Sequence, residues 1–512
     1  MGDTPRARGS CYDDCNKVMG RLSKAADEGE DAMKMLFACG ASVLALGLIA
    51  TLTMAQAPKI GDPPEVSNMR LVGYNDLQAR SAYQPTLIHQ GNRYLAYVGH
   101  HGGAGDVPKP INPMTREAEF NGTSIIDVTD PANPKYLKHI PGAQGGTEAG
   151  GAQMVRVCPG TNLPRADRNK FYMLRTFGTK GHEVWDVTDP VNPARLASIG
   201  GNYQDTHKSW WECDTGIAYV VSAVPGWRAK RMTEVYDLGD PSKPVKIRDF
   251  GLPGQEPGST GAVPTDLHGP ISLPEVNRVY FGYGSSSGGM LQIVDREKLL
   301  KGPKEPTPDN LRYPEISRLE MYPLVGAHTV FPMLRMTIDE FANDGVPVRD
   351  FVMIVNEATR NECKPQAREM VWFADITVES HPMMISNFMV KEKTGNFCSR
   401  GGRFGAHSSQ ESMAPVFYKK LAMVAFFNAG LRVIDVRDPY QPKEVGHFIP
   451  SITEATDKRC VRVGEEQRCK VAIQTNNVET DDRGYIYIVD RANTGMHILE
   501  LTGPARAIAG LP

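Results

Sequence analysis

The stretch LRVIDVRDPYQPKEV (431–445) decides the fold, because close copies of it recur along the chain. In each copy an apolar strand ends in an aspartate, an Asp-Pro pair follows three residues later, and a further proline comes after it. The closest copies are NGTSIIDVTDPANPKYL (121–137), GHEVWDVTDPVNPARL (181–196) and TEVYDLGDPSKPVKI (233–247). Alternating apolar residues predict a strand, and the Asp-Pro with its later proline predicts a tight turn.

Weaker copies extend the pattern over the whole chain after residue 60. VWFADITVESHPMMI (371–385) keeps the first aspartate and the last proline, and LQIVDREKL (291–299) and MHILELTGP (496–504) are degenerate. A second apolar strand precedes each copy, as in RYLAYVGH (93–100) and GYIYIVDR (484–491). Seven copies of a four-stranded antiparallel unit predict an all-β, seven-bladed β-propeller, which protects its strand edges by closing into a ring.

The ends of the repeat region predict how the ring closes. The last copy stops after its third strand, and NMRLVGY (68–74) precedes the first copy as an isolated strand. We expect this N-terminal strand to complete the last blade, so that residues 58–512 form a single propeller.

The third strands LRVIDV, TSIIDV and LQIVD resemble the LVIVD repeat of exported bacterial and archaeal propellers. The resemblance covers the region after residue 60 and implies the propeller fold. It implies no particular activity, because one fold carries many functions.

Residues 1–57 have the character of a leader. MKMLFACGASVLALGLIATLTMAQA (33–57) joins a lysine to a long apolar run and ends in small residues, which predicts a signal peptide cleaved after Ala57. Residues 1–32 are then either a polar extension or lie before the true start at Met33. An uncleaved membrane anchor is the alternative. We expect a periplasmic or secreted protein.

Six cysteines remain after such a leader, an even number that suits disulfides in an oxidising compartment. Cys460 and Cys469 flank a short hairpin and form the best candidate pair. The other expected pairs are Cys158 with Cys213 and Cys363 with Cys398. The net charge of −2, with no basic stripe, argues against a nucleic-acid partner.

Histidines recur just before the first strand of four consecutive repeats. They are His207 (QDTHKSWW), His268 (TDLHGPIS), His328 (VGAHTVFP) and His407 (FGAHSSQE). Gln84, Gln153 and Asn476 occupy this place in the other three repeats. Since first strands line the axis of a propeller, four imidazoles would converge there, and imidazole suits Fe, Cu, Zn and Ni.

A structural role for these histidines is the alternative, because hydrogen bonds between blades need the same groups, and Gln or Asn would serve equally. The metal hypothesis gains from a resemblance, by analogy of architecture alone, to carotenoid cleavage oxygenases. In those propellers four axial histidines hold Fe(II), and carboxylates orient the imidazoles. The resemblance assigns that orienting role here to Asp205, Asp266 or Glu357, although Asp205 and Asp266 also suit turns.

Loops between second and third strands open on the same face and supply Glu357, His100 and His101 as candidate catalytic residues. The sequence thus predicts an exported protein with one metal ion, Fe(II) first and Cu or Zn as alternatives, that oxidises or oxidatively cleaves a small organic substrate. A metal-assisted hydrolase or lyase with Glu357 as general base would use the same ligands. The competing class is a non-enzymatic propeller that binds a protein or polysaccharide. The oligomeric state is left open.

Overall fold

The computed structural model describes residues 58–512 apart from 103–108, 346 and 360–369. The predicted leader, 1–57, lies outside the described residues. Strands that pair antiparallel make up a little under half of the described residues. Within the described chain no helix is long and apolar enough to cross a membrane.

The strands pair into four-stranded units in which each strand neighbours the next one along the chain. The first three units consist of β3 (Ala82–Gln90), β4 (Arg93–His101), β5 (Gly122–Asp127) and β6 (Lys135–Pro141); β8 (Val155–Pro159), β9 (Phe171–Phe177), β10 (Gly181–Asp186) and β11 (Ala194–Ile199); and β12 (Trp210–Trp211), β13 (Ile217–Ser222), β14 (Met232–Asp237) and β15 (Val245–Phe250). The next three consist of β16 (Leu267–Leu273), β17 (Arg278–Tyr283), β18 (Met290–Asp295) and β19 (Glu315–Glu320); β20 (Thr329–Thr337), β21 (Val348–Val355), β22 (Val371–Asp375) and β23 (Met383–Phe388); and β24 (Phe404–Ser409), β25 (Leu421–Phe427), β26 (Leu431–Asp435) and β27 (Lys443–Ile449).

The seventh unit joins the two ends of the described chain. It consists of β30 (Thr475–Thr480), β31 (Ile486–Asp490), β32 (Met496–Leu501) and β2 (Met69–Asn75). Strand β2 runs antiparallel to β32, which confirms that an N-terminal strand completes the last blade. The preceding strand β1 (Glu65–Ser67) pairs with β27 of the sixth unit, so the same segment also ties two neighbouring blades together.

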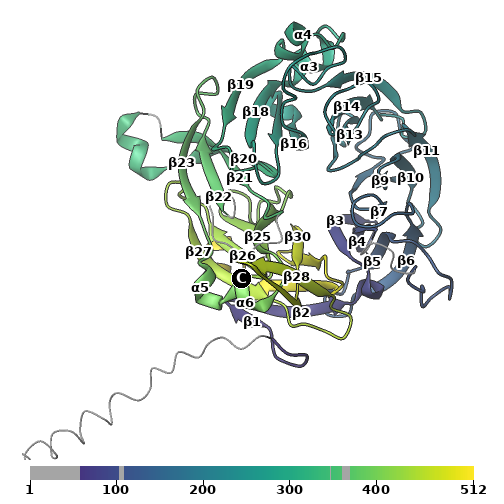
Figure 1. The fold of residues 1–512 in the computed structure, drawn as a ribbon, viewed down its shortest axis with the longest axis vertical. Helices are drawn as coiled ribbons and strands as arrows, with labels where there is room; N and C mark the ends of the chain where they lie inside the picture. Colours follow the sequence, from purple (N-terminus) through teal and green to yellow (C-terminus); the bar gives the residue numbers. More distant parts are fainter. Residues whose placement is uncertain (1–57, 103–108, 346, 360–369) are drawn as a thin grey trace, which may run out of the picture. The chain divides into compact units, whose positions relative to one another are not determined.

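The first strands of the units form a closed ring. Each contacts the first strand of the next unit, in the order β3, β8, β12, β16, β20, β24, β30 and back to β3. Figure 1 shows the sheets arranged around this ring, with β3, β16, β20 and β30 near its centre. The arrangement is that of a β-propeller and is consistent with the predicted seven blades.

The repeated aspartates explain why the copies share their sequence. The carboxylate of Asp435 accepts a hydrogen bond from the backbone N–H of Arg437, and that of Asp438 accepts one from Tyr440. The same two-residue pattern recurs at the aspartates of the three closest copies. Such bonds stabilise the turn locally, which makes the turn readable from sequence.

Between the sheets the apolar faces pack against each other. One cluster joins Tyr219 and Val221 of the third blade to Phe281 and Tyr283 of the fourth. Short helices, a hairpin and a two-residue strand complete the described fold: β7 (Gly151–Ala152), η1 (Leu77–Ala79), η2 (Pro274–Val276), η3 (Asp339–Asp344), α3 (Arg296–Lys301), α4 (Pro308–Arg312), α5 (Glu392–Gly395), α6 (Phe397–Arg400), β28 (Lys458–Val463), β29 (Glu466–Val471) and α7 (Gly503–Ala509).

Disulfides form where the sequence predicted two of them. Cys158 is bonded to Cys213, which links the second and third blades, and Cys460 is bonded to Cys469 across the β28–β29 hairpin. Cys398 is also disulfide-bonded. Its predicted partner, Cys363, lies outside the described residues.

Candidate metal centre

The four repeated histidines lie next to one another at the ring of first strands. His207 and His328 come just before β12 and β20, as expected, whereas His268 and His407 lie inside β16 and β24. The ring centroids of successive histidines are 4.4, 3.5 and 4.4 Å apart. Because the four first strands are neighbours, the repeat alone brings the imidazoles together, and all four are buried.

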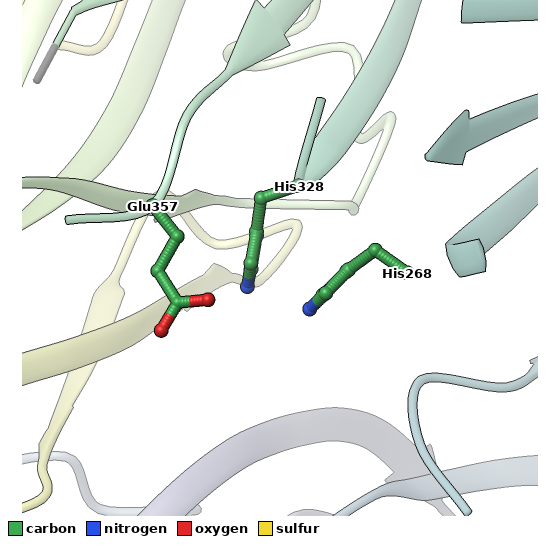
Figure 2. Close-up of side chains that lie close together, drawn as sticks. All are labelled: His268, His328 and Glu357. Carbon is green, nitrogen blue, oxygen red and sulfur yellow. The ribbon is translucent and has the colours of Figure 1, made fainter. Parts of the chain in front are cut away.

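Three residues place possible ligand atoms close together. In the described part of the chain, one atom each of His268, His328 and Glu357 lie within 4.8 Å of one another, and all three side chains are buried. Figure 2 shows the two imidazoles and the carboxylate directed toward a common region. Metal bonds of these ligands are about 2.0–2.2 Å long, so a small side-chain movement would bring all three atoms onto one ion.

Two ring nitrogens in this group have no hydrogen-bond partner among the described residues, Nδ1 of His268 and Nε2 of His328. Buried polar atoms are normally paired, so each such atom needs an explanation. For Nε2 of His328 a bound ion is one, because a neutral imidazole nitrogen without a proton is a metal ligand. At His268 the unpartnered Nδ1 carries the ring proton, since the amide nitrogen of Gln153 donates to Nδ1 of His207 and Nε2–H of His207 donates to Nε2 of His268.

Burial keeps the four imidazoles neutral. It lowers the pKa of His207, His268 and His328 well below its usual value, and that of His407 to about 3. The nearby positive charge of Lys208 acts in the same direction on all four, and that of Arg231 on His207 and His268. Burial also raises the pKa of Glu357, while the guanidinium of Arg403, 3.4 Å from its carboxylate, opposes that rise.

The backbone holds Glu357 between two neighbouring blades. Its N–H donates to the carbonyl of Ser285 in the fourth blade, at 3.0 Å. The N–H of Ala358 donates to the carbonyl of Ala406 in the sixth blade, also at 3.0 Å. Glu357 follows β21, where a loop between second and third strands was expected, and its placement next to the histidines depends on these long-range bonds.

His207 and His407, the other two predicted ligands, make hydrogen bonds between blades. Nε2 of His207 lies 2.7 Å from Nε2 of His268, and its Nδ1 lies 3.2 Å from the amide nitrogen of Gln153. Nδ1 of His407 donates to the carbonyl of Asn476 at 2.5 Å, which leaves Nε2 facing the carboxylate of Glu357 at 3.8 Å. These two residues therefore adjoin the three-residue group without belonging to it.

The sequence interpretation missed Tyr83. Its hydroxyl lies 3.5 Å from Nε2 of His207, and its ring lies 5.8 Å from that of His407. Gln84 occupies the position at which four other repeats carry histidine, and Tyr83 directly precedes it. The alignment of the repeats therefore already placed Tyr83 next to the histidines.

The two adjacent histidines of β4 take different positions. The ring of His101 packs edge-on against Tyr83, 4.9 Å away, and neither of its nitrogens has a partner among the described residues. The Nε2 atom of His100 is instead bonded to the hydroxyl of Ser124 on β5, at 2.7 Å. Of the pair, His101 is the one that packs on Tyr83, whose ring also contacts His207 and His407.

Charged side chains surround the histidines, and one carboxylate oxygen of Glu148 lies 3.9 Å from Nδ1 of His207. Arg231 contacts Glu148 at 2.8 Å and Asp205 at 2.9 Å, so Asp205 pairs with an arginine and not with an imidazole. Asp266 accepts a hydrogen bond from the backbone N–H of Lys230. Among the described residues, therefore, neither aspartate is hydrogen-bonded to one of the four histidines, as the expected orienting role requires.

Comparison with known proteins gives one sequence match and several similar structures. Residues 418–449 match the LVIVD repeat family, and no curated protein matches the chain. Similar solved structures include Chaetomium thermophilum Raptor (10% identity, TM-score 0.48, 88% of this chain and 29% of Raptor), U3-55K (10%, 0.48, 86% and 100%) and the RRP9 WD40 repeats (10%, 0.45, 87% and 99%). The chain thus spans less than a third of the length of Raptor. Residues 418–449, which contain β25, β26 and β27, are an LVIVD repeat, a repeat of β-propellers, as the resemblance of LRVIDV indicated.

Proposed function

We propose that this chain is an exported, metal-dependent propeller that oxidises a small organic molecule at an ion held by His268, His328 and Glu357. The observation that carries the proposal is the buried group of two histidines and one carboxylate with ligand atoms within 4.8 Å. Two histidines and one carboxylate with open positions are the ligand set of non-haem Fe(II) oxygenases. Fe(II) is therefore the first expected ion, with Cu or Zn as alternatives. The proposal narrows the expected four-histidine site to three ligands.

The surrounding residues suit this role. Burial keeps the imidazoles in the neutral form that binds metal, and Arg403 favours the charged form of Glu357. A bound ion would supply redox chemistry and a position for dioxygen or substrate. Among the predicted catalytic residues, Glu357 is itself part of the three-residue group, whereas His101 packs against Tyr83.

A second candidate function has its own observation. His207 and His407 bond to groups of neighbouring blades, which is what a purely structural role requires. A non-enzymatic propeller that binds a protein or polysaccharide would need no more than this. The convergence of ligand atoms from His268, His328 and Glu357 within 4.8 Å of one another favours the metal site over this alternative.

Metal analysis of four matched proteins tests the proposal. We expect about one equivalent of a transition metal in the wild type and its loss in His328→Ala and Glu357→Ala. His182→Ala is the control, because His182 is equally buried but bonds to Ser222 of the next blade instead of joining the histidine cluster. No metal in the wild type, even after reconstitution with Fe(II), Cu(II) and Zn(II), would leave the binding propeller as the function.

Export is supported by the disulfides, which persist in oxidising compartments. Mass spectrometry of the protein from the periplasmic or secreted fraction tests it. A mature chain that begins near residue 58 is expected. A chain found only in the cytoplasm, with reduced cysteines, would contradict the proposal.

A further inference from the structure

A polar cavity is lined by residues that directly neighbour His268 and come two positions after Glu357 in the sequence. It has a volume of about 590 Å³, within the range of small-molecule sites, and eleven residues line it. Asp205 precedes His207 by two residues, Leu267 directly precedes His268, and Thr359 follows Glu357 by two residues. Ser285, whose carbonyl accepts the hydrogen bond from Glu357, is also part of the wall. The cavity and the centre therefore share the same backbone segments.

Hydroxyl groups dominate the wall. They come from two threonines and three consecutive serines: Thr265, Ser285, Ser286, Ser287 and Thr359. Thr359 donates a hydrogen bond to Ser286 at 2.6 Å. The hydroxyls of Thr265, Ser285 and Ser287 make no hydrogen bond to any residue that the structure describes, so they are available to a ligand.

The charges of the wall are balanced. The guanidinium of Arg231 forms ion pairs with Asp205 and Glu148. The ammonium of exposed Lys230 has no ion pair within the described residues, and one carboxylate oxygen of Asp266 is likewise unused. One free donor and one free acceptor of opposite charge give no preference for an anion or a cation.

Such a wall selects the chemistry of its ligand. Leu267 is its sole aliphatic side chain. An apolar substrate, of the kind that the carotenoid oxygenase analogy suggests, would strip water from hydroxyls and charges without replacing those bonds, which is unfavourable. A neutral molecule with many hydroxyl groups replaces them, since each hydroxyl both donates and accepts.

We infer that this cavity binds a neutral polyhydroxylated molecule of monosaccharide or disaccharide size and presents it to the metal centre. The binding of the molecule is argued from the cavity alone, whereas its presentation to the metal centre rests on the proposed function. The binding bonds come from Lys230, Asp266 and the free hydroxyls, and none of them requires the ion.

Saturation-transfer NMR with the full chain tests the inference, with methyl α-D-glucopyranoside and maltose as saccharide probes and geraniol as the apolar probe. We expect transfer to at least one saccharide and a reduction of roughly fivefold or more in affinity for the Lys230→Met/Ser287→Val variant, because each lost hydrogen bond weakens binding by about that factor. Lys243→Met is the control, since Lys243 is an exposed lysine on the turn between β14 and β15. It should bind like the wild type.

Three outcomes would overturn the inference. They are no transfer to either saccharide, transfer that the Lys230→Met/Ser287→Val variant leaves unchanged, and a preference for geraniol. Saccharide binding should persist in His328→Ala, which separates this test from that of the metal site. A protein without metal that still binds saccharide would refute the proposed oxidation and leave the cavity assignment standing.

Discussion

Nε2 of His207 lies 2.7 Å from Nε2 of His268, so that one hydrogen bond joins the third and fourth blades at the ring of first strands. One of these nitrogens must donate a proton and the other must accept it. Neither atom can bind a metal ion while it takes part in that bond. The contact therefore distinguishes a centre with four histidine ligands from one with two.

Replacement of His207 tests this distinction. In the three-ligand centre His207→Phe keeps about one equivalent of metal, because the variant removes a competitor of His268 and not a ligand. If Nε2 of His268 is the ligand atom, affinity should rise by roughly fivefold, the value of one hydrogen bond. Metal titration by calorimetry measures the change. Loss of metal in His207→Phe, with retained folding, would restore the four-histidine centre.

Thr329 is expected to fix the proton position of His328. Its hydroxyl lies 2.9 Å from Nδ1 of His328 and accepts a hydrogen bond from Lys208 at 3.0 Å, and it lies 3.4 Å from the hydroxyl of Ser408. A lysine ammonium has no acceptor, so the Thr329 hydroxyl must accept the hydrogen bond from Lys208. The same hydroxyl can also accept a hydrogen bond from Nδ1–H of His328 and donate its own hydrogen to Ser408. The ring proton of His328 then stays on Nδ1, which leaves Nε2 free to bind metal.

Thr329→Val removes this acceptor at nearly constant volume, whereas Thr329→Ser keeps it. We expect Thr329→Val to weaken metal binding by about 10–100-fold, the usual effect of losing a group that orients a histidine ligand. Thr329→Ser should bind like the wild type. Nitrogen-15 NMR of the imidazoles gives an independent measurement, because Thr329→Val alone should change the tautomer of His328. Equal affinity of the two variants would remove Thr329 from this role.

The fold was predictable because its signals are local. The aspartates of 431–445 stabilise turns within two residues, and the apolar alternation marks each strand. The last repeat lacks its fourth strand, so the ring can close only if another segment supplies that strand. In the structure β2 supplies it. Ring position also put His207, His268, His328 and His407 together without any structure.

The atomic arrangement of the centre was not predictable. The position of Glu357 depends on backbone bonds to Ser285 and to the sixth blade, which are remote in sequence. Asp205 has the spacing of an orienting carboxylate but pairs with Arg231, a residue from another strand connection. Whether two side chains of neighbouring blades form a hydrogen bond depends on differences of a few tenths of an ångström in the distance between them. A repeat pattern tells only which residue occupies which position of a strand.

The two disulfides of described residues should contribute unequally to stability. Cys158–Cys213 spans 55 residues and Cys460–Cys469 spans 9. Loop entropy predicts a loss of about 4 kcal/mol for Cys158→Ala/Cys213→Ala and about 2.5 kcal/mol for Cys460→Ala/Cys469→Ala. Urea unfolding of both double variants beside the wild type measures the difference. The reverse order would show that strain or residual structure in the unfolded chain outweighs loop length.

His497 should make the closure of the ring sensitive to acid. It lies on β32 directly opposite Tyr74 of β2, with ring centroids 5.0 Å apart. Burial lowers its pKa to about 4, below the value of about 6.5 expected in the unfolded chain. Above pH 6.5 the His497 ring is neutral in both the folded and the unfolded state, so its titration does not change the free energy of unfolding. As the pH falls from 6.5 toward 4 the unfolded state takes up the proton first, so stability declines by up to about 3 kcal/mol.

His497→Gln removes this titration while it keeps a neutral polar side chain of similar length. The variant should lose stability less steeply than the wild type between pH 6.5 and 4, so that the difference in unfolding free energy shifts in its favour by up to about 3 kcal/mol. All other titrating groups are common to both proteins and cancel in the comparison. Urea unfolding at pH 7, 5.5 and 4.5 gives the two curves. Parallel curves would mean that His497 titrates normally in the folded state, and therefore that the seam between β2 and β32 admits water.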